Sequence, residues 1–250
     1  MSEELKFALT VAGFDGCAGA GVLADVKAMA YFGVYAEAVL TALTEQNEDR
    51  FVNPGFCSSE KILNQLEILY QKRSFGFVKI GLVENAATLK MIVDFIRNKN
   101  PEAFIVWDPV ASATAGFSFF KDCEAVDFLP VLKRLDLVTP NLHEYAILGI
   151  DRAVAEGRLN LGADFQILLK GGHSSGNEAV DVLWMKDGCR YEFSSPRVAF
   201  DKHGTGCNLS SAIVANMALG FDLPESCRRA KAYMDKFILS GEGRLGFLTR

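Results

Sequence analysis

Two kinds of hydrophobic pattern alternate along this chain. Short runs rich in Val, Ile, Leu and Phe are typical of buried strands, and segments with an apolar residue every three or four positions are typical of helices. The runs predict strands over Phe7–Ala12, Tyr35–Ala42, Phe77–Ile80, Phe104–Trp107, Leu135–Val138 and Gln166–Leu169, with an antiparallel edge from Val180–Trp184 and Tyr191–Phe193. The periodic segments predict helices over Ala20–Phe32, Ser59–Tyr70, Ala86–Arg97, Ala125–Lys133, Leu209–Leu219 and Pro224–Ser240.

This order of strands and helices predicts an α/β fold. Strands that alternate with helices are joined by right-handed crossovers, which give a mostly parallel sheet covered by helices on both faces. We therefore expect a three-layer α/β/α architecture. The chain shows no internal repeat, low-complexity tract or linker, so one domain over residues 1–250 is expected.

The composition narrows the class of protein. Half of the 250 residues are hydrophobic, the net charge is −5, and no run of Lys and Arg is present, so a nucleic-acid surface is not expected. No apolar run is long enough to span a membrane, and the first residues do not resemble a secretory signal. The six cysteines are scattered without a C-x-x-C pair, which indicates reduced thiols and a cytoplasmic location.

Polar or glycine-rich segments follow each predicted parallel strand. Ligands of open α/β sheets bind beyond the carboxyl ends of the strands, so these segments are expected to meet at one site. In chain order they are Gly13–Asp15, Thr44–Asn47, Lys79–Leu82, Asp108–Val110, Thr139–Glu144 and Lys170–His173. A structural protein has no need for such a pattern, which therefore favours an active site.

The segment His203–Cys207 has the pattern of an anion-binding helix start. Its two glycines let the backbone approach a ligand, and the following helix offers unpaired N–H groups and the positive end of its dipole. Cys207 lies among these donors, where a thiol pKa is expected to be lowered, and an anion hole beside a potential base suggests phosphoryl transfer. The competing interpretation is a glycine-rich helix start with a buried cysteine. His203 is expected to be structural.

Further candidates have two interpretations each. Asn141 and Glu144 at a helix start could hold a hydrated Mg²⁺ or form an ordinary capping box. Asp108 could face a ligand or cap a turn, and Lys170 could reach a nucleotide phosphate or be a solvated strand end.

The glycine-rich segment 13–21 is best interpreted as a loop over a small substrate, with Asp15 and Asp25 as polar contacts. The run Gly19–Ala24 fits the dinucleotide-binding fingerprint only superficially. Its first glycine lies several residues after the strand, and no acidic residue clearly ends the second strand.

Taken together, these motifs resemble the hydroxymethylpyrimidine/phosphomethylpyrimidine kinases of thiamine biosynthesis, which belong to the ribokinase-like superfamily. The resemblance extends from about Leu9 to Lys236. It rests on Ala12–Asp15, Ala18–Gly21, Ala24–Lys27, Phe32–Tyr35, Thr41–Asn47, Lys79–Leu82, Asp108–Val110, Thr139–Glu144, Leu169–His173 and His203–Cys207.

The resemblance implies a kinase that uses ATP and Mg²⁺, has no separate lid domain, forms a homodimer and phosphorylates a hydroxymethyl group on an aromatic heterocycle. Cys207 matches the family's catalytic base, and Gly204, Thr205 and Gly206 its anion hole. The other matches comprise substrate contacts at Gly13, Asp15, Ala20, Asp25, Gln46 and Leu82, nucleotide contacts at Asp108, Lys170 and Gly172, and the metal-site motif at Asn141 and Glu144.

The chain also departs from the family pattern. Phe14 replaces a small hydroxyl residue, Ala18 a glycine and Asn208 a threonine, and the loop after Asp108 lacks the usual lysine. The segment Gly149–Asp164 is shorter than expected for the helix that the family usually has there. These departures leave two alternatives: a pyridoxal or pyridoxine kinase with a pocket reshaped by Phe14, and a sensor that binds the heterocycle without turnover.

Overall fold

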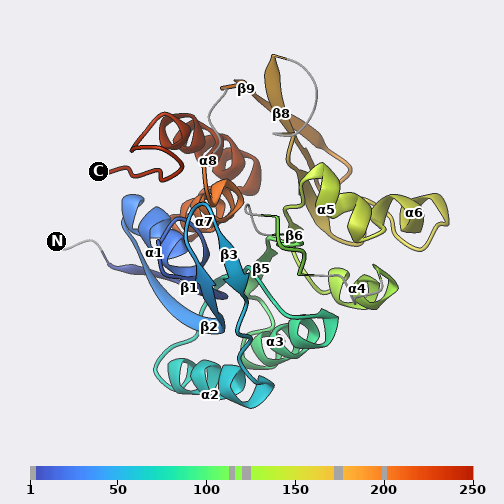
Figure 1. Cartoon of the computed structure of the whole chain (residues 1–250). Coiled ribbons are helices and arrows are strands. Elements are labelled where there is room, and N and C mark those ends of the chain that lie inside the picture. The colour runs from blue at the N-terminus through green and yellow to red at the C-terminus, as the bar shows by residue number, and fades with distance from the viewer. Residues whose placement is uncertain (1–3, 113–115, 120–124, 172–176, 199–201, 250) are drawn as a thin grey trace.

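The computed structural model describes residues 4–112, 116–119, 125–171, 177–198 and 202–249. These residues contain one nine-stranded sheet with the order β3-β2-β1-β4-β5-β6-β7-β8-β9 (Figure 1). Strands β2, β1, β4, β5, β6 and β7 run parallel to one another, whereas β3 pairs antiparallel with β2, β8 with β7 and β9 with β8. The strands are β1 (Lys6–Asp15), β2 (Val34–Gln46), β3 (Phe51–Asn53), β4 (Phe77–Ile80), β5 (Phe104–Trp107), β6 (Leu137–Val138), β7 (Gln166–Leu169), β8 (Glu178–Trp184) and β9 (Arg190–Pro196).

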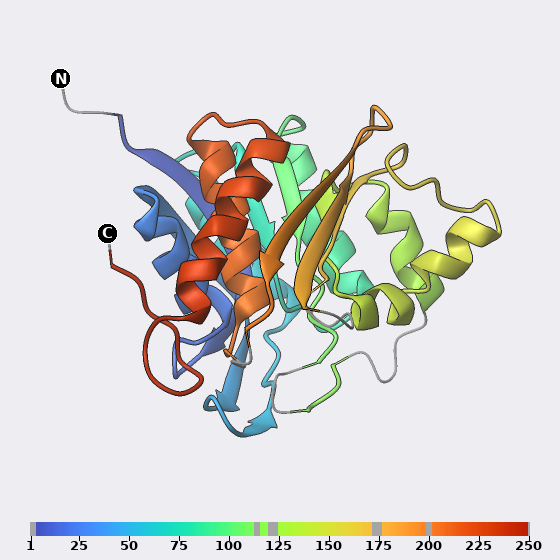
Figure 2. The same ribbon diagram turned by 90° about the horizontal axis from the view of Figure 1, so that it is seen from above.

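Helices cover both faces of this sheet, as Figures 1 and 2 show. One face carries α1 (Gly21–Tyr31), α7 (Thr205–Ala218) and α8 (Leu223–Ile238), and its core includes Ala28, Val106 and Ile213. The other face carries α2 (Ser59–Tyr70), α3 (Ala86–Lys99), α4 (Ala125–Leu132), α5 (Leu142–Ile147) and α6 (Ile150–Ala155). The three-layer, mostly parallel α/β fold expected from the sequence is therefore confirmed.

Several elements differ from the prediction at their ends. Strands β1 and β2 continue past Gly13 and Ala42 to Asp15 and Gln46, because the two strands stay paired after a register shift at Ala12/Gly13. Helix α7 begins at Thr205 instead of Leu209, because its first turn is built from the small residues of the anion-hole motif. The longer strands and the earlier start of α7 all place polar groups of the motifs at the same edge of the sheet.

Two short elements were not predicted, β3 and α6, whereas the helix start expected at Asn141 and Glu144 is that of α5. The segment Gly149–Asp164, which is shorter than the family pattern, contains the six-residue helix α6. Strand β3 pairs antiparallel with the end of β2, so the two form a ribbon at one edge of the sheet. None of the described helices is long and apolar enough to cross a membrane.

Candidate active site

A cavity of about 710 Å³ lies at the carboxyl ends of the parallel strands. The loops after β1, β4, β5, β6 and β7, the end of β2 and the start of α7 all line it, as the sequence predicts. It brings together most of the predicted site residues: Gly13, Asp15, Ala20, Gln46, Leu82, Asp108, Asn141, Glu144, Lys170, Gly204, Thr205, Gly206 and Cys207. Gly172 lies outside the described residues.

The start of α7 lies between two parts of this cavity, the loop before α1 and the side chains of Lys170 and Asp108. Gly204 has φ +73°, and a Cβ there would lie 2.0 Å from the carbonyl oxygen of Gly19, so only glycine fits against the loop before α1. A Cβ on Gly206 would lie 3.0 Å from Lys170 Nζ and 3.3 Å from Asp108 Oδ2. The unpaired N–H groups of this helix start therefore lie beside a lysine, an arrangement suited to a phosphate group.

Cys207 lies in the first turn of α7 and is 8% exposed, on the cavity wall. Burial raises the pKa of its thiol to about 11, although the charge of Lys79 and a hydrogen bond from the Gly21 backbone act to lower it. The sequence-based expectation of a lowered pKa is therefore wrong. Desolvation in this packed site outweighs the helix start and the nearby lysine, so the resting thiol is protonated at neutral pH.

Lys170 and Asp108 form an ion pair on the cavity wall. Lys170 Nζ lies 2.8 Å from Asp108 Oδ1 and 3.7 Å from Glu144 Oε2, and Thr139 also donates to Asp108. Burial alone would raise the pKa of Asp108, but the charges of Lys170 and Lys79 outweigh it and hold that pKa below its ordinary value. Lys170 is thus an anchored cation and not a solvated strand end.

Asn141 and Glu144 form a capping box at the start of α5. Asn141 Oδ1 accepts from the Glu144 N–H and Glu144 Oε2 accepts from the Asn141 N–H, both at 2.8 Å. Burial raises the pKa of Glu144 to about 7; Lys170 lowers it and Asp108 raises it. Asp108, Asn141 and Glu144 therefore present three oxygen-bearing side chains around one lysine, which is a donor set that Mg²⁺ prefers.

Asp25 does not contact the cavity, so its prediction as a substrate contact needs correction. Its carboxylate is fully buried and accepts hydrogen bonds from Lys79 at 2.5 Å, Ser211 at 2.8 Å and Thr10 at 2.5 Å. These bonds tie β1, α1, β4 and α7 together below the site. In the sequence, Asp25 closely follows the glycine-rich loop and is therefore expected near the ligand. In the structure, it lies on the buried face of α1.

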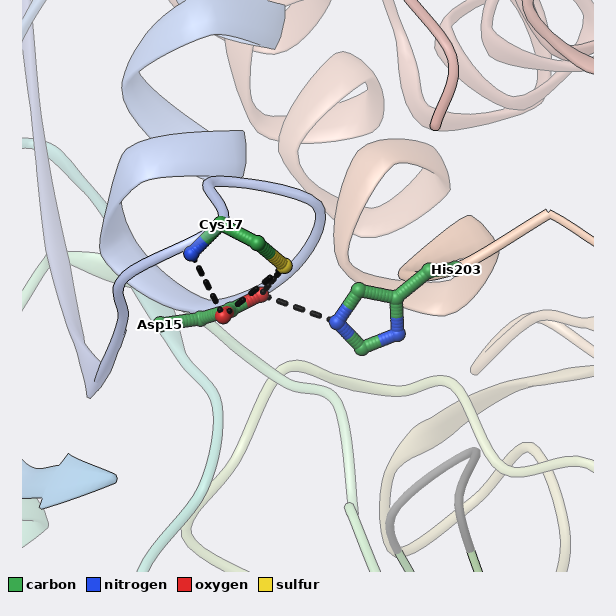
Figure 3. A group of neighbouring side chains, drawn as sticks. All are labelled: Asp15, Cys17 and His203. Atoms are coloured by element: carbon green, nitrogen blue, oxygen red, sulfur yellow. Dashed lines mark hydrogen bonds and ion pairs between the residues drawn. The ribbon is translucent and has the colours of Figure 1, made fainter. Parts of the chain in front are cut away.

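The Asp15 carboxylate is held by several donors at the wall of the cavity (Figure 3). His203 Nε2 lies 2.8 Å from its Oδ2, the Ala20 N–H donates at 2.9 Å, and the N–H and thiol of Cys17 both donate to it. These bonds hold the Asp15 pKa below its ordinary value even though burial raises it. The structural role expected for His203 fits this pairing.

Sequence reasoning missed a second group of cavity residues on β8, β9 and α8. Ser195 Oγ is buried and has no hydrogen-bond partner among the described residues, and Lys231 pairs with Asp181 at 2.8 Å. These strands had been identified only as an antiparallel edge, and no motif in them signals a ligand. In contrast, Phe14 is not among the described residues that line the cavity, which removes the reason to expect a reshaped pocket.

Comparisons with known proteins agree with this geometry. The phosphomethylpyrimidine kinase family profile matches residues 15–245. A hydroxymethylpyrimidine/phosphomethylpyrimidine kinase from Aquifex aeolicus is 35% identical, over 92% of this chain and 93% of its own. A thiamine biosynthesis bifunctional protein from Geobacter sulfurreducens is also 35% identical, over 90% of this chain and 48% of its own length.

The fold also matches that of solved kinases. The structure of pyridoxal kinase from Staphylococcus aureus in complex with AMP-PCP and pyridoxal superposes with a TM-score of 0.78. It covers 96% of this chain and 90% of the kinase, at 24% sequence identity. At that identity the match shows the shared fold.

Proposed function

The chain belongs to the phosphomethylpyrimidine kinase family, and from this we infer that it is a phosphotransferase of thiamine biosynthesis. It transfers a phosphoryl group from ATP to 4-amino-5-hydroxymethyl-2-methylpyrimidine, to its monophosphate, or to both. The single observation that carries this inference is the match over 92% of the chain to a kinase of this activity, together with a cavity that holds the motif residues in one place.

We propose that Cys207 is the base. Its thiolate takes the proton of the substrate hydroxymethyl group, the freed oxygen bonds to the γ-phosphorus of ATP, and the bond to the β–γ bridging oxygen breaks so that ADP leaves with the electron pair. Because burial raises the thiol pKa to about 11, only a small fraction is thiolate at neutral pH. That fraction suffices where positioning and charge stabilisation carry most of the rate enhancement, as they do in phosphoryl transfer.

The charge that develops on the transferred group is stabilised by fixed donors. The N–H groups of Thr205 and Gly206 in the first turn of α7 are proposed to bind its oxygens, with Gly204 as the left-handed residue that starts the turn. Lys170 Nζ lies beside Gly206 and supplies the positive charge. These groups are held before substrate binds, so they need little reorganisation during the reaction.

The residues at the nucleotide end fit a magnesium ion. Asp108, Asn141 and Glu144 would hold it, directly or through water, and Gly172 is proposed to contact the nucleotide. When bound, such an ion neutralises charge on the phosphates of ATP. The raised Glu144 pKa fits this role, since burial outweighs the charge of Lys170 and favours the protonated form until a metal ion adds further positive charge.

At the other end, the heterocycle is proposed to lie among Gly13, Asp15, Ala20, Gln46 and Leu82. Gln46 Nε2 donates to Thr44 Oγ1 at 2.9 Å, which leaves the amide oxygen of Gln46 for an amino group of the ring. Leu82 supplies an apolar wall. A 4-amino-pyrimidine offers the complementary donor, whereas a pyridoxine ring has a hydroxyl at that edge.

Steady-state ADP release from MgATP tests the function. We expect turnover with hydroxymethylpyrimidine or its monophosphate at a kcat/KM well above that with pyridoxine. A higher kcat/KM with pyridoxine would transfer the same mechanism to the other ring. Tight heterocycle binding without ADP release would support the sensor instead. The single domain, the homodimer and the cytoplasmic location stay predictions.

A further inference from the structure

The cluster around Asp15 contains three chemically different metal-ligating groups. Asp15, Cys17 and His203 each offer one ligand atom, and these atoms all lie within 4.8 Å of one another (Figure 3). Asp15 ends β1 and Cys17 lies in the loop after it, whereas His203 precedes α7, so the fold and not local sequence brings His203 to the other two. Asp15 and His203 are 1% and 4% exposed, and Cys17 is partly buried.

We propose that Asp15, Cys17 and His203 form a binding site for a zinc-class divalent cation, distinct from the magnesium site at Asp108, Asn141 and Glu144. A carboxylate, a thiolate and an imidazole are ligands that tetrahedral zinc accepts, while hard Mg²⁺ disfavours the sulfur. The three groups already converge, so binding needs only small shifts of side chains that now hydrogen-bond to one another.

The supporting groups of this site are in place. The backbone N–H groups of Cys17 and Ala20 donate to the Asp15 carboxylate at 3.1 and 2.9 Å and fix its orientation. Such outer bonds orient a ligand before a metal arrives. Asp15 and His203 both line the cavity, so an ion held between them would border the ligand space.

Binding at this site exchanges protons for the ion. The Cys17 thiol, which now donates to Asp15, loses its proton to solvent, and His203 gives up the Nε2 proton that it shares with Asp15, to solvent or to its own Nδ1, so that the Nε2 lone pair binds the metal. The ammonium of Lys27, held by the Ala18 carbonyl, interacts with both acidic groups from α1.

Occupancy of this site would inhibit the kinase. The consequence rests on the proposed function, in which Asp15 lies at the heterocycle end of the cavity. An ion there binds the Asp15 carboxylate and occupies the space beside it, so the heterocycle and the metal compete for this part of the cavity. Zinc inhibition should then be relieved by high heterocycle concentration and not by high MgATP.

Titration of the full chain with Zn²⁺ alone, in competition with a chromophoric chelator, tests the site without catalysis. Cd²⁺ as a second probe reports a thiolate ligand through its ultraviolet charge-transfer band. Cys17→Ser keeps a hydroxyl donor for Asp15 and removes the soft ligand. We expect it to weaken Zn²⁺ binding by at least about 100-fold and to abolish the cadmium band.

Cys189→Ser is the matched control, since Cys189 is an exposed thiol on the turn between β8 and β9. It should bind Zn²⁺ and Cd²⁺ as the unaltered chain does. Equal Zn²⁺ affinity in the unaltered chain and Cys17→Ser would overturn the proposal, as would a cadmium band that survives this substitution. Turnover measured without zinc is independent of these titrations, so failure of the kinase assignment and failure of the metal site remain distinguishable.

Discussion

Two of the buried lysine–aspartate pairs among the described residues have opposite surroundings. Lys79 and Asp25 lie below the cavity, are fully buried, and leave no exposed surface on either side chain. Lys170 and Asp108 lie on the cavity wall, and the lysine side chain keeps 13% of its surface exposed. The same two residue types thus form a sealed pair and an open pair, and both pairs would interact electrostatically with a thiolate at Cys207.

The partners of each pair explain the difference. Asp25 accepts from Lys79, Ser211 and Thr10, so its oxygens are saturated by groups of the fold. Lys170 instead lies between Asp108 and the more distant Glu144, whose pKa burial raises to about 7. A saturated pair holds elements together, whereas an unsaturated cluster of charges is prepared to receive a charged ligand. The pairs should therefore respond differently to substitution.

Lys79→Met should have the largest effect, and the effect should be on stability. Removal of the ammonium leaves the Asp25 carboxylate buried without its counter-charge, which is expected to lower the free energy of unfolding by about 3–5 kcal/mol. Denaturant unfolding measures this change. The double variant with Asp25→Asn should recover part of the loss. A decrease below about 1 kcal/mol, typical of solvated pairs, would contradict the sealed pair.

Lys170→Met should affect catalysis more than stability. Asp108 keeps its bond from Thr139 and faces the cavity, so unfolding should change less than in Lys79→Met. Loss of a donor to the transferred group is expected to lower kcat by about 10²–10³-fold. Stopped-time ADP assays and unfolding curves on the same preparations check both expectations. An intact kcat with a stability loss equal to that of Lys79→Met would show that the two pairs are equivalent.

The pH dependence of magnesium binding tests the surroundings of the Lys170–Asp108 pair further. The Glu144 pKa is raised to about 7, so below that pH a proton competes with the cation. Apparent Mg²⁺ affinity should rise by up to about tenfold per pH unit below pH 7 and level off above it. In Glu144→Gln the affinity should be weak and independent of pH. A similar profile in both proteins would remove Glu144 from the metal site.

The raised pKa of Glu144 also makes the stability of the metal-free enzyme depend on pH. Because the folded state binds the Glu144 proton more tightly than the unfolded chain, the folded state carries the extra proton between pH 4.5 and about 7. Stability contributed by this group therefore decreases as pH rises through that window. Mg²⁺ should offset the loss at pH 7, which thermal unfolding with and without the ion can measure.

Asn141→Ala should have the smallest effect of the set. It removes one bond of the capping box on α5, for an expected loss of about 1 kcal/mol in unfolding free energy. Asn85→Ala is the control, because Asn85 caps α3 with a similar bond to the Thr88 N–H. Only Asn141→Ala should also raise KM for MgATP. An equal KM in both variants would leave Asn141 with a capping role alone.

The sequence predicted the central fold well because its strands contain apolar runs and several helices, among them α2, α3 and α8, have a clear apolar face. It did not predict β3, because this three-residue strand is defined by its hydrogen bonds to β2 and not by its own sequence pattern. The residues at strand ends were correctly expected to lie together, because parallel strands bring their carboxyl ends to one edge. The prediction for Asp25 was wrong because a residue that lines the cavity and a residue that lies in the core can be only one turn of α1 apart.

The electrostatics were the least predictable part. The pattern at Cys207 correctly indicated a helix start, yet the thiol pKa depends on how completely the site excludes water. No local pattern reports that burial. The contacts of Ser195, Asp181 and Lys231 were missed for a related reason, since they reach the cavity from an antiparallel edge that carries no motif.

The most direct test of the account is the pH–rate profile of the kinase reaction with Cys207→Ala beside the unaltered chain. We expect kcat to increase with pH above neutrality in the unaltered chain, because the thiol pKa is about 11. Cys207→Ala should lower kcat by about 10²–10⁴-fold with little change in heterocycle affinity, and its profile should lose this rise. A variant with an unchanged kcat, or with a loss confined to KM, would contradict Cys207 as the base.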